Sequence, residues 1–299
     1  MKRVLAEGLD YNTNDLRAVT PEELRKYIEE FRAKRKNDEI LDLSRIKLSV
    51  GRSKEAEREL SDSGKKENTV ESSVCVENKQ VEEENRREGL DCGENRINLA
   101  GEDFSFVDFS WSDFQDVDFH GADFSNSVLD HARFVNTDFH NAVLKDASLY
   151  GADLRGCDLS YTDCDGTVFT ASILIGANLE GLKDTERTVH FKMACPETGY
   201  FFGYKKCFND RMVQLLIPAD AKRCSSTTNA CRCDKAITVA IMNPDKTGFY
   251  TEATSFVDGD FTYRLGEMSY ADSYHEDRWL DSSHGIHFWM TFEEALGYM

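Results

Sequence analysis

A period of five residues runs unbroken from Asn98 to Gly181 and constrains the fold of this chain more than any other feature. A large apolar residue, in one case a cysteine, stands at every fifth position, which gives seventeen consecutive occurrences. They are Leu99, Phe104, Phe109, Phe114, Phe119, Phe124, Leu129, Phe134, Phe139, Leu144, Leu149, Leu154, Leu159, Cys164, Phe169, Leu174 and Leu179. A helix repeats about every 3.6 residues and a strand about every two, so the pattern indicates a repeat architecture instead.

A second position, two residues before each large one, carries mostly small side chains such as Ala122, Ala132 and Ala142. The residue between the two is often Asp or Asn. This spacing points one large and one small side chain toward an axis and leaves the other three toward water. Stacked segments then bury a continuous ladder that no single segment can bury alone. Cys157 and Cys164 fall on inward positions, where we expect them to act as small hydrophobic residues.

The stretches GADFSNSVLDHARFVNTDF and YGADLRGCDL contain the motif A(D/N)LxX, and through them this block resembles the pentapeptide-repeat family. The resemblance implies a right-handed, four-sided β-helix in which each pentapeptide forms one side and four pentapeptides form one coil. We therefore expect a mainly β protein.

A helix is predicted near the N-terminus. Thr20 supplies an N-cap hydroxyl, Pro21 suits the first helical position, and Glu23 completes a capping box. The apolar stripe that follows is formed by Leu24, Tyr27, Ile28 and Phe31. We expect this stripe to cover the open N-terminal end of the repeat core, with Phe106 and Trp111 as its docking partners. The alternative is that Phe106 and Trp111 form a surface for a partner.

Composition divides the chain into four parts. The predicted bounds are 1–49 for the N-terminal helix and solenoid cap, 50–96 for a flexible charged insertion, 97–182 for the β-helix and 183–299 for a small C-terminal α+β domain. The insertion has no aromatic residue and many charged ones, so it cannot bury enough apolar surface to offset the entropy of ordering. Leu43 and Leu48 are five apart, which indicates that the solenoid begins before the insertion and is interrupted by it.

The charge of the chain is strongly negative, with a formal net charge of −19. The repeat block from Asn98 to Gly181 holds 15 acidic and three basic residues, so most of the net charge lies there. Like charge repels, which argues against nucleic acid or an anionic membrane as a direct ligand. A partner that itself binds nucleic acid is compatible with this charge.

Residues 20 apart are expected to stack on one side of the solenoid, at about 4.8 Å spacing. Two adjacent sides then carry acidic columns, formed by Asp118, Asp138 and Asp158 and by Asp103, Asp123 and Asp163. Over a rod of about 20 Å, duplex DNA carries roughly twelve charges, and the repeat block carries a similar number. The alternative is that each Asp serves its own turn through a short-range hydrogen bond.

These features predict an acidic DNA mimic that binds and inhibits or modulates a nucleic-acid-handling protein. The partner would be a host DNA- or RNA-binding protein or a nuclease complex, and the source a phage or mobile element that blocks a host defence. Oligomerisation is possible. A protein-protein interaction scaffold without mimicry is the alternative. No enzymatic activity and no cofactor are expected.

Quinolone-resistance proteins have similar repeats and act on DNA gyrase as DNA look-alikes. They are typically longer and dimerise through a C-terminal helix. This chain has about four coils and a separate C-terminal domain, which does not favour gyrase as the target.

The C-terminal part loses the period of five and shows short apolar runs that predict strands, followed by a helix that begins after Thr291. The segments HFKMACPETGYFFGYKKC and SSHGIHFWMTFEEALGY resemble a domain of unknown function that accompanies pentapeptide repeats in bacteria and phages. As a third possibility, this domain is an unrecognised enzyme or zinc module. Its weak candidate residues are Cys224, Cys231, Cys233, His284 and His287. His120 and His140, one coil apart, are a second weak metal candidate.

Cysteine usage and the N-terminal sequence predict the compartment. An odd number of cysteines, nine, fits reduced thiols better than a disulfide framework. The opening residues, MKRVLAEGLDYN, lack the apolar stretch of a signal peptide. We therefore expect a cytoplasmic protein.

Overall fold

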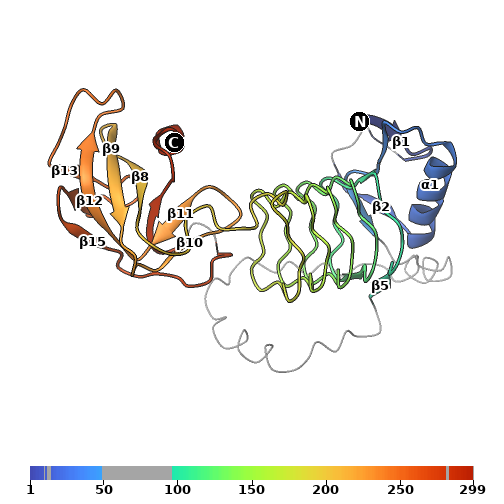
Figure 1. The fold of residues 1–299 in the computed structure, drawn as a ribbon. Helices are drawn as coiled ribbons and strands as arrows, with labels where there is room; N and C mark the ends of the chain where they lie inside the picture. The colour runs from blue at the N-terminus through green and yellow to red at the C-terminus, as the bar shows by residue number, and fades with distance from the viewer. Residues whose placement is uncertain (10, 12–14, 49–95, 281–282, 299) are drawn as a thin grey trace, which may run out of the picture.

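The computed structural model describes residues 1–9, 11, 15–48, 96–280 and 283–298. Except for Arg96, the predicted insertion at 50–96 lies outside the described residues. Along the chain, an N-terminal helix with short strands is followed by a stack of coils and then by a C-terminal domain built of sheets (Figure 1). As predicted, the described residues are mainly β. Their helices are all too short or too polar to cross a membrane.

The coils are built from residues that pair with partners 20 positions further along. Parallel bridges join Asp118 to Asp138 and Asp138 to Asp158, and equivalent bridges run along the other sides. The N–H of Phe119 donates to the carbonyl of Asp138 at 2.8 Å, and similar bonds recur throughout the stack. The short strands within the repeats are β5 (Ile97–Asn98), β6 (Val107–Asp108) and β7 (Val117–Asp118). Four pentapeptides therefore make one coil, as the β-helix of the repeat family requires.

Ring geometry in the core follows the same repeat of 20 residues. Rings that are 20 residues apart stack nearly in parallel: Phe114 on Phe134 at 13° and Phe119 on Phe139 at 22°. Rings that are five residues apart meet edge to face, as Phe119 and Phe124 do at 86°. Such a pattern arises when successive pentapeptides lie on neighbouring sides that are roughly perpendicular. All of these rings are fully buried.

Every fifth backbone position from 101 to 181 has a positive φ, because the chain turns a corner there. This conformation favours Gly, Asn and Asp, which occupy most of these positions. Phe106, Trp111 and Tyr161 adopt it as well, at a steric cost. Gly151 is constrained twice, because an added Cβ would also lie 2.5 Å from Nδ1 of His131 on the preceding coil.

The first coil is assembled from both sides of residues 49–95. Its N-terminal half contains β3 (Glu39–Asp42), which pairs in parallel with β6, and Lys47, which bridges to Asp113. Its other half contains β5, which pairs with β7. Two further strands extend this end, β1 (Lys2–Leu5) beside β3 and β2 (Arg17–Val19) beside β4 (Ile46–Leu48). These pairings confirm that the solenoid begins before residue 49.

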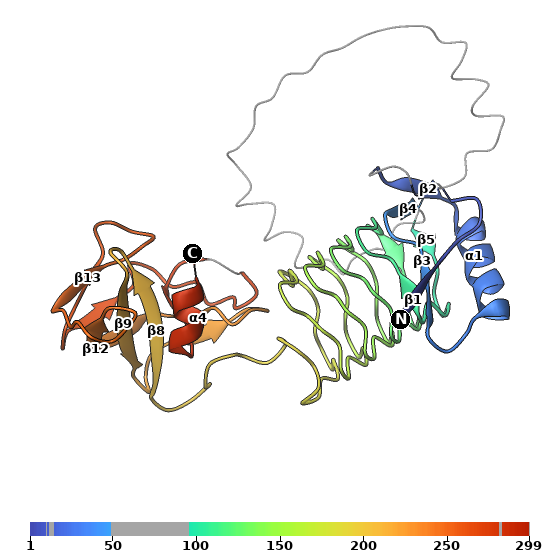
Figure 2. The ribbon, with the colours of Figure 1, turned by 90° about the horizontal axis from the view of Figure 1, so that it is seen from above.

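Helix α1 (Pro21–Lys34) lies across the N-terminal end of the coils (Figures 1 and 2). Thr20 and Glu23 form the predicted capping box. Leu24, Ile28 and Phe31 are buried in the same hydrophobic core as the repeat ladder. Docking of Trp111 on this stripe was the wrong expectation, because Trp111 is 51% exposed and its ring stacks on His131 at 4.2 Å. The alternative, an exposed surface, stays a prediction.

The C-terminal domain contains a four-stranded antiparallel sheet in the order β15-β12-β9-β8 and smaller sheets beside it. The four strands are β8 (Phe201–Cys207), β9 (Arg211–Ile217), β12 (Lys235–Met242) and β15 (Met268–Tyr270). The smaller sheets join β10 (Arg223–Ser225), β11 (Cys231–Cys233) and β16 (Ile286–Phe288), and β13 (Glu252–Thr254) with β14 (Thr262–Arg264). Helix α4 (Phe292–Gly297) begins with the predicted Thr291 cap.

The C-terminal domain packs directly on the last coil of the solenoid. Phe191 lies 5.5 Å from Phe169 of the ladder and 5.6 Å from Trp279. The Thr227 hydroxyl donates to the Ser172 carbonyl at 2.7 Å. Side chains of α1 thus contact the repeat core at one end, and Phe191 and Trp279 contact it at the other.

Cys164 provides a test of how closed the core is. Its thiol is fully buried at a large inward position, and burial raises its pKa to about 12. Only the thiolate reacts with alkylating agents. We expect iodoacetamide at about pH 8 to leave Cys164 unmodified in the folded protein and to modify it in urea, as measured by peptide mass spectrometry. Equal modification in both conditions would show that the coil opens readily.

Candidate functional site

One predicted acidic column lies in the structure as a continuous ladder. Asp118, Asp138 and Asp158, here called the acidic column, are joined by parallel bridges on one side of the solenoid and are each partly exposed. In each, Oδ1 accepts a hydrogen bond from the backbone N–H two residues further on. The donors are His120 at 2.9 Å, His140 at 2.8 Å and Ser160 at 2.9 Å.

The hydrogen bond to the turn does not require a negative charge. Asn98 and Asn178 stand at the two ends of the same side of the solenoid, in register with the acidic column. Their Oδ1 atoms accept the same bond from Ala100 at 3.0 Å and Glu180 at 3.2 Å. An amide oxygen thus satisfies the turn as an aspartate does. The turn explains the shape of the side chain at these positions but not its charge.

Acids on the other sides of the solenoid are mostly neutralised. Among these pairs, Arg3 lies 2.6 Å from Asp108, Lys47 lies 3.5 Å from Asp113, and Arg155 lies 2.6 Å from Asp153. Asp108 is also buried, so its charge is not available to a partner.

The second predicted acidic column is neutralised at both ends. Arg32 of α1 lies 2.5 Å from Asp103, and Lys145 lies 3.1 Å from Asp163. The carboxylate of Asp163 raises the pKa of Lys145 in return. Asp123 lies between them, bridged to Asp103 on one coil and to Val143 on the next. This column is therefore a much weaker acidic surface than the sequence predicts.

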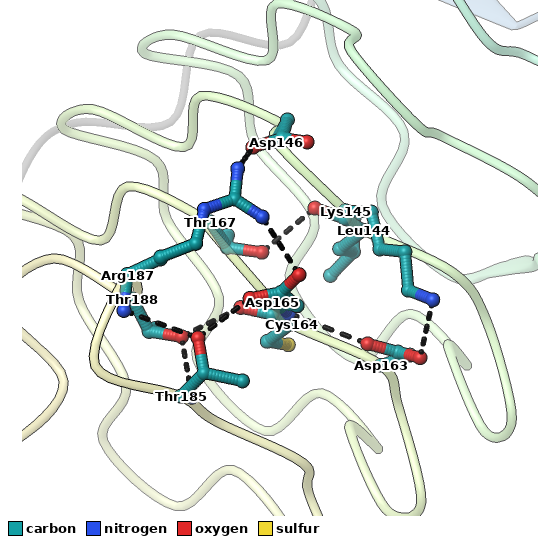
Figure 3. Close-up of polar contacts among 10 residues, drawn as sticks. All are labelled: Leu144, Lys145, Asp146, Asp163, Cys164, Asp165, Thr167, Thr185, Arg187 and Thr188. Atoms are coloured by element: carbon teal, nitrogen blue, oxygen red, sulfur yellow. Dashed lines mark hydrogen bonds and ion pairs between the residues drawn. The ribbon is translucent and has the colours of Figure 1, made fainter.

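Figure 3 shows how two carboxylates near the C-terminal end of the repeats, those of Asp146 and Asp165, are neutralised. Arg187 reaches back from beyond the repeats and bonds to both Asp146 and Asp165. The Thr185 hydroxyl donates to Asp165 at 2.6 Å, and this bond, together with Arg187, lowers the pKa of that carboxyl group. Asp165 stays ionised but is already paired.

By contrast, within the described parts of the chain the acidic column forms no ion pair. Neutral groups surround it instead: Ser160 and Asn178 both donate to Asp158. His120 and His140 stack beside it at 5.1 Å, and Nδ1 of His140 lies 2.8 Å from the Ser160 hydroxyl. The described residues thus leave a continuous row of three carboxylates on this side without a paired cation.

The weak metal candidates in the C-terminal domain are divided between the two faces of a sheet. Cys231 and Cys233 alternate with Arg232 along β11, so they point to the opposite face. Cys224 and His287 both lie opposite Arg232 in the neighbouring strands. His284 lies outside the strands and is exposed. Across the described residues, no three His, Cys, Asp or Glu side chains form a group that could hold a metal ion, and this includes His120 and His140.

The geometry defines a repeat solenoid with an appended sheet domain, and comparison with known families agrees. Residues 95–130, 103–141, 122–160 and 147–182 match the family of pentapeptide repeats (8 copies). Residues 191–295 match a family of unknown function, DUF5758. Residues 95–182 are therefore pentapeptide repeats, and residues 191–295 form a C-terminal domain of unknown function. No curated protein shows significant sequence similarity.

Solved structures with similar coils come from several sources. Rfr23 from the cyanobacterium Cyanothece 51142 is 22% identical, with a TM-score of 0.16 over 31% of this chain and 84% of that chain. A thylakoid-lumen protein of Arabidopsis thaliana is 33% identical, with a TM-score of 0.23 over 31% and 57%. QnrB1, a plasmid-mediated fluoroquinolone resistance protein, is 18% identical, with a TM-score of 0.18 over 32% and 73%. At these TM-scores the likenesses carry no weight for function.

The neutralising cations are the functional feature that sequence reasoning missed. Arg32 lies 71 positions before its partner Asp103, and Arg187 lies 41 positions after Asp146. No periodic signal connects such pairs. The sequence did contain a signal for the acidic column. Asn98 and Asn178 stand in place of aspartate at the two ends of the same side of the solenoid.

Proposed function

We propose that this protein is a non-enzymatic interaction protein whose acidic column occupies the nucleic-acid-binding cleft of a basic partner. The observation that supports this most is the contrast between the sides of the solenoid. Most acids on the other sides of the solenoid are paired with Arg or Lys, whereas the described residues leave all three carboxylates of the acidic column unpaired. We include in this proposal a right-handed, four-sided solenoid over 97–182 and a distinct α+β domain over 183–299.

Unpaired stacked carboxylates cost stability, which is why their retention points to binding. At about 5 Å apart, two such charges repel by about 0.8 kcal/mol even at the dielectric of water. Asparagine would supply the same turn hydrogen bond without this repulsion, as Asn98 and Asn178 show. A basic cleft would remove the repulsion and gain favourable electrostatic interactions.

The column is short, and its length limits what it imitates. Three carboxylates at about 4.8 Å spacing cover about 10 Å, or roughly three base pairs of duplex at about 3.4 Å each. We therefore propose that the column fills the centre of a cleft while other surfaces of the chain add contacts. The partner class is a DNA- or RNA-binding protein or a nuclease complex, inhibited or modulated in the cytoplasm. Blocking of a host defence nuclease by a phage or mobile-element protein is one such setting.

Salt dependence and competition by DNA test this proposal. The protein, immobilised, is exposed to bacterial lysate at about 50 mM and about 200 mM salt, with and without a short DNA duplex. We expect the partner to be captured at low salt, with a roughly tenfold or greater loss at high salt and displacement by the duplex.

If the amount of captured partner changes neither with salt nor with added duplex, the result would contradict DNA mimicry and favour the scaffold function. Loss of capture with salt but without displacement by the duplex would indicate an electrostatic contact outside a nucleic-acid cleft. The control is the variant in which Asp118, Asp138 and Asp158 are all replaced by asparagine, so that the solenoid keeps its shape but loses the acidic column.

A further inference from the structure

The C-terminal domain contains a cavity, open to solvent, that the proposed interaction does not use. Its volume is about 530 Å³, within the range of about 300 to 1,000 Å³ that is typical of small-molecule sites. It opens between β8, β16 and the segment from Ser255 to Leu280. Much of its wall is apolar, formed by Val257, Phe261, Tyr263, Ala271, Leu280 and Ile286.

A buried cation lines this cavity. Lys205 in β8 is only 5% exposed, and its Nζ donates to the His287 carbonyl at 3.1 Å. An ammonium group has three donors, and this is the one bond the structure gives it among the described residues. Burial lowers the pKa of Lys205, and the thiols of Cys207 and Cys233 oppose this shift in part. A buried ammonium without an anionic partner is costly.

A second polar group in the cavity also lacks a partner. The Ser283 hydroxyl is buried and forms no hydrogen bond to any residue that the structure describes. A buried hydroxyl of this kind has a hydrogen bond to offer to a bound molecule. Lys205 and Ser283 thus offer unused donors to one cavity with apolar walls.

The rim of the cavity limits the charge of a ligand. Asp258 and Asp272 line it and are exposed, together with His275 and His284. Two carboxylates at the rim would repel a phosphate or a polycarboxylate more strongly than a single negative charge. The apolar wall requires a ligand with a matching apolar body.

We propose that this cavity binds a small organic monocarboxylate, whose carboxylate pairs with Lys205 and whose apolar body lies against Phe261, Tyr263 and Ile286. The Ser283 hydroxyl is a further donor to the bound ligand. The site gives the domain of unknown function a ligand-binding role that is independent of the acidic column.

Calorimetric titration of the full-length protein tests this assignment with matched probes. Octanoate should bind, and its neutral analogue octanamide should bind at least roughly tenfold more weakly, because the charge-assisted bond to Lys205 is absent. Inorganic phosphate alone should show no saturable binding. Lys205→Met should abolish octanoate binding without unfolding the domain, because it removes a buried charge and keeps the apolar length. Lys206→Met, on the same strand with its Nζ bonded to the Leu296 carbonyl, should bind octanoate normally.

The comparison of octanoate with octanamide uses the unaltered protein, so its result remains valid even if a variant misfolds. Equal binding of octanoate and octanamide, or no binding of octanoate in the millimolar range, would overturn the proposal. So would full octanoate affinity in a folded Lys205→Met protein. Phosphate binding that matches octanoate would show that the apolar wall plays no part and would overturn the ligand class.

Discussion

Replacing Asp118, Asp138 and Asp158 together by asparagine is expected to weaken partner binding while leaving the solenoid as stable as before. Each exposed charge pair contributes about 0.2 to 1 kcal/mol, so three pairs predict a loss of roughly threefold to a hundredfold in affinity. The melting temperature should stay unchanged or rise slightly, because repulsion along the column is removed. Binding is measured by titration with the captured partner and stability by thermal unfolding.

The substitution isolates charge because asparagine preserves the local structure. Asn98 and Asn178 occupy the same side of the solenoid and make the same bond to the N–H two residues ahead. The solenoid should therefore keep its turns in the triple variant. A loss of binding with an unchanged melting temperature can then be attributed to the carboxylates.

A matched control removes the same net charge elsewhere. Asp260→Asn, Glu267→Gln and Glu293→Gln lie on exposed positions of the C-terminal domain. If binding depends on overall charge, both triple variants should weaken it equally. If it depends on the acidic column, the control should bind like the unaltered protein. Undiminished binding by the column variant would refute the proposed site.

Phe119→Ala is expected to lower the free energy of unfolding by about 3 to 5 kcal/mol, the largest effect of any single substitution considered for this chain. Phe119 is fully buried, stacks on Phe139 at 5.5 Å and meets Phe104, Phe114 and Phe124 edge to face. Truncation would leave a cavity that opens toward two neighbouring coils. Because each coil is stabilised mainly by its neighbours, the loss should spread along the stack.

Urea unfolding followed by circular dichroism measures this effect. Phe119→Leu should cost less than Phe119→Ala, because leucine leaves a smaller cavity and is fully buried in the same ladder at Leu129 and Leu144. Gln115→Ala, at an exposed position of the same coil, should change stability by less than about 0.5 kcal/mol. A cost of Phe119→Ala no larger than that of Gln115→Ala would mean that the ladder is not tightly packed.

Much of the fold was predictable because its signals are local and repeated. Each pentapeptide meets the same environment, so the buried ladder from Leu99 to Leu174 could be predicted residue by residue. The capping boxes at Thr20 and Thr291 were predictable for the same reason, since their partners lie three residues away. Trp111 was misjudged because the corner it occupies turns its side chain outward, onto His131.

The candidate site was predictable only in part. The register of 20 residues placed Asp118, Asp138 and Asp158 on one side without any coordinates, and it placed Asp103, Asp123 and Asp163 on the next. Which of these columns keeps its charge depends on cations that approach from elsewhere in the chain. Neither the cavity around Lys205 nor its unused donors left a sequence signal, because the cavity is formed by segments up to 82 residues apart.

The amino-acid sequence by itself therefore determined the solenoid, its inward ladder and the in-register acidic columns, because these arise from short-range periodicity. The tertiary structure decided which acids remain unpaired and where a cavity lies in the C-terminal domain. Arg32 and Arg187 neutralise their partners only because α1 and the chain beyond the repeats fold back onto the coils. Ion pairing acts over distances of a few ångströms in space, and the spacing of residues along the chain does not reveal it.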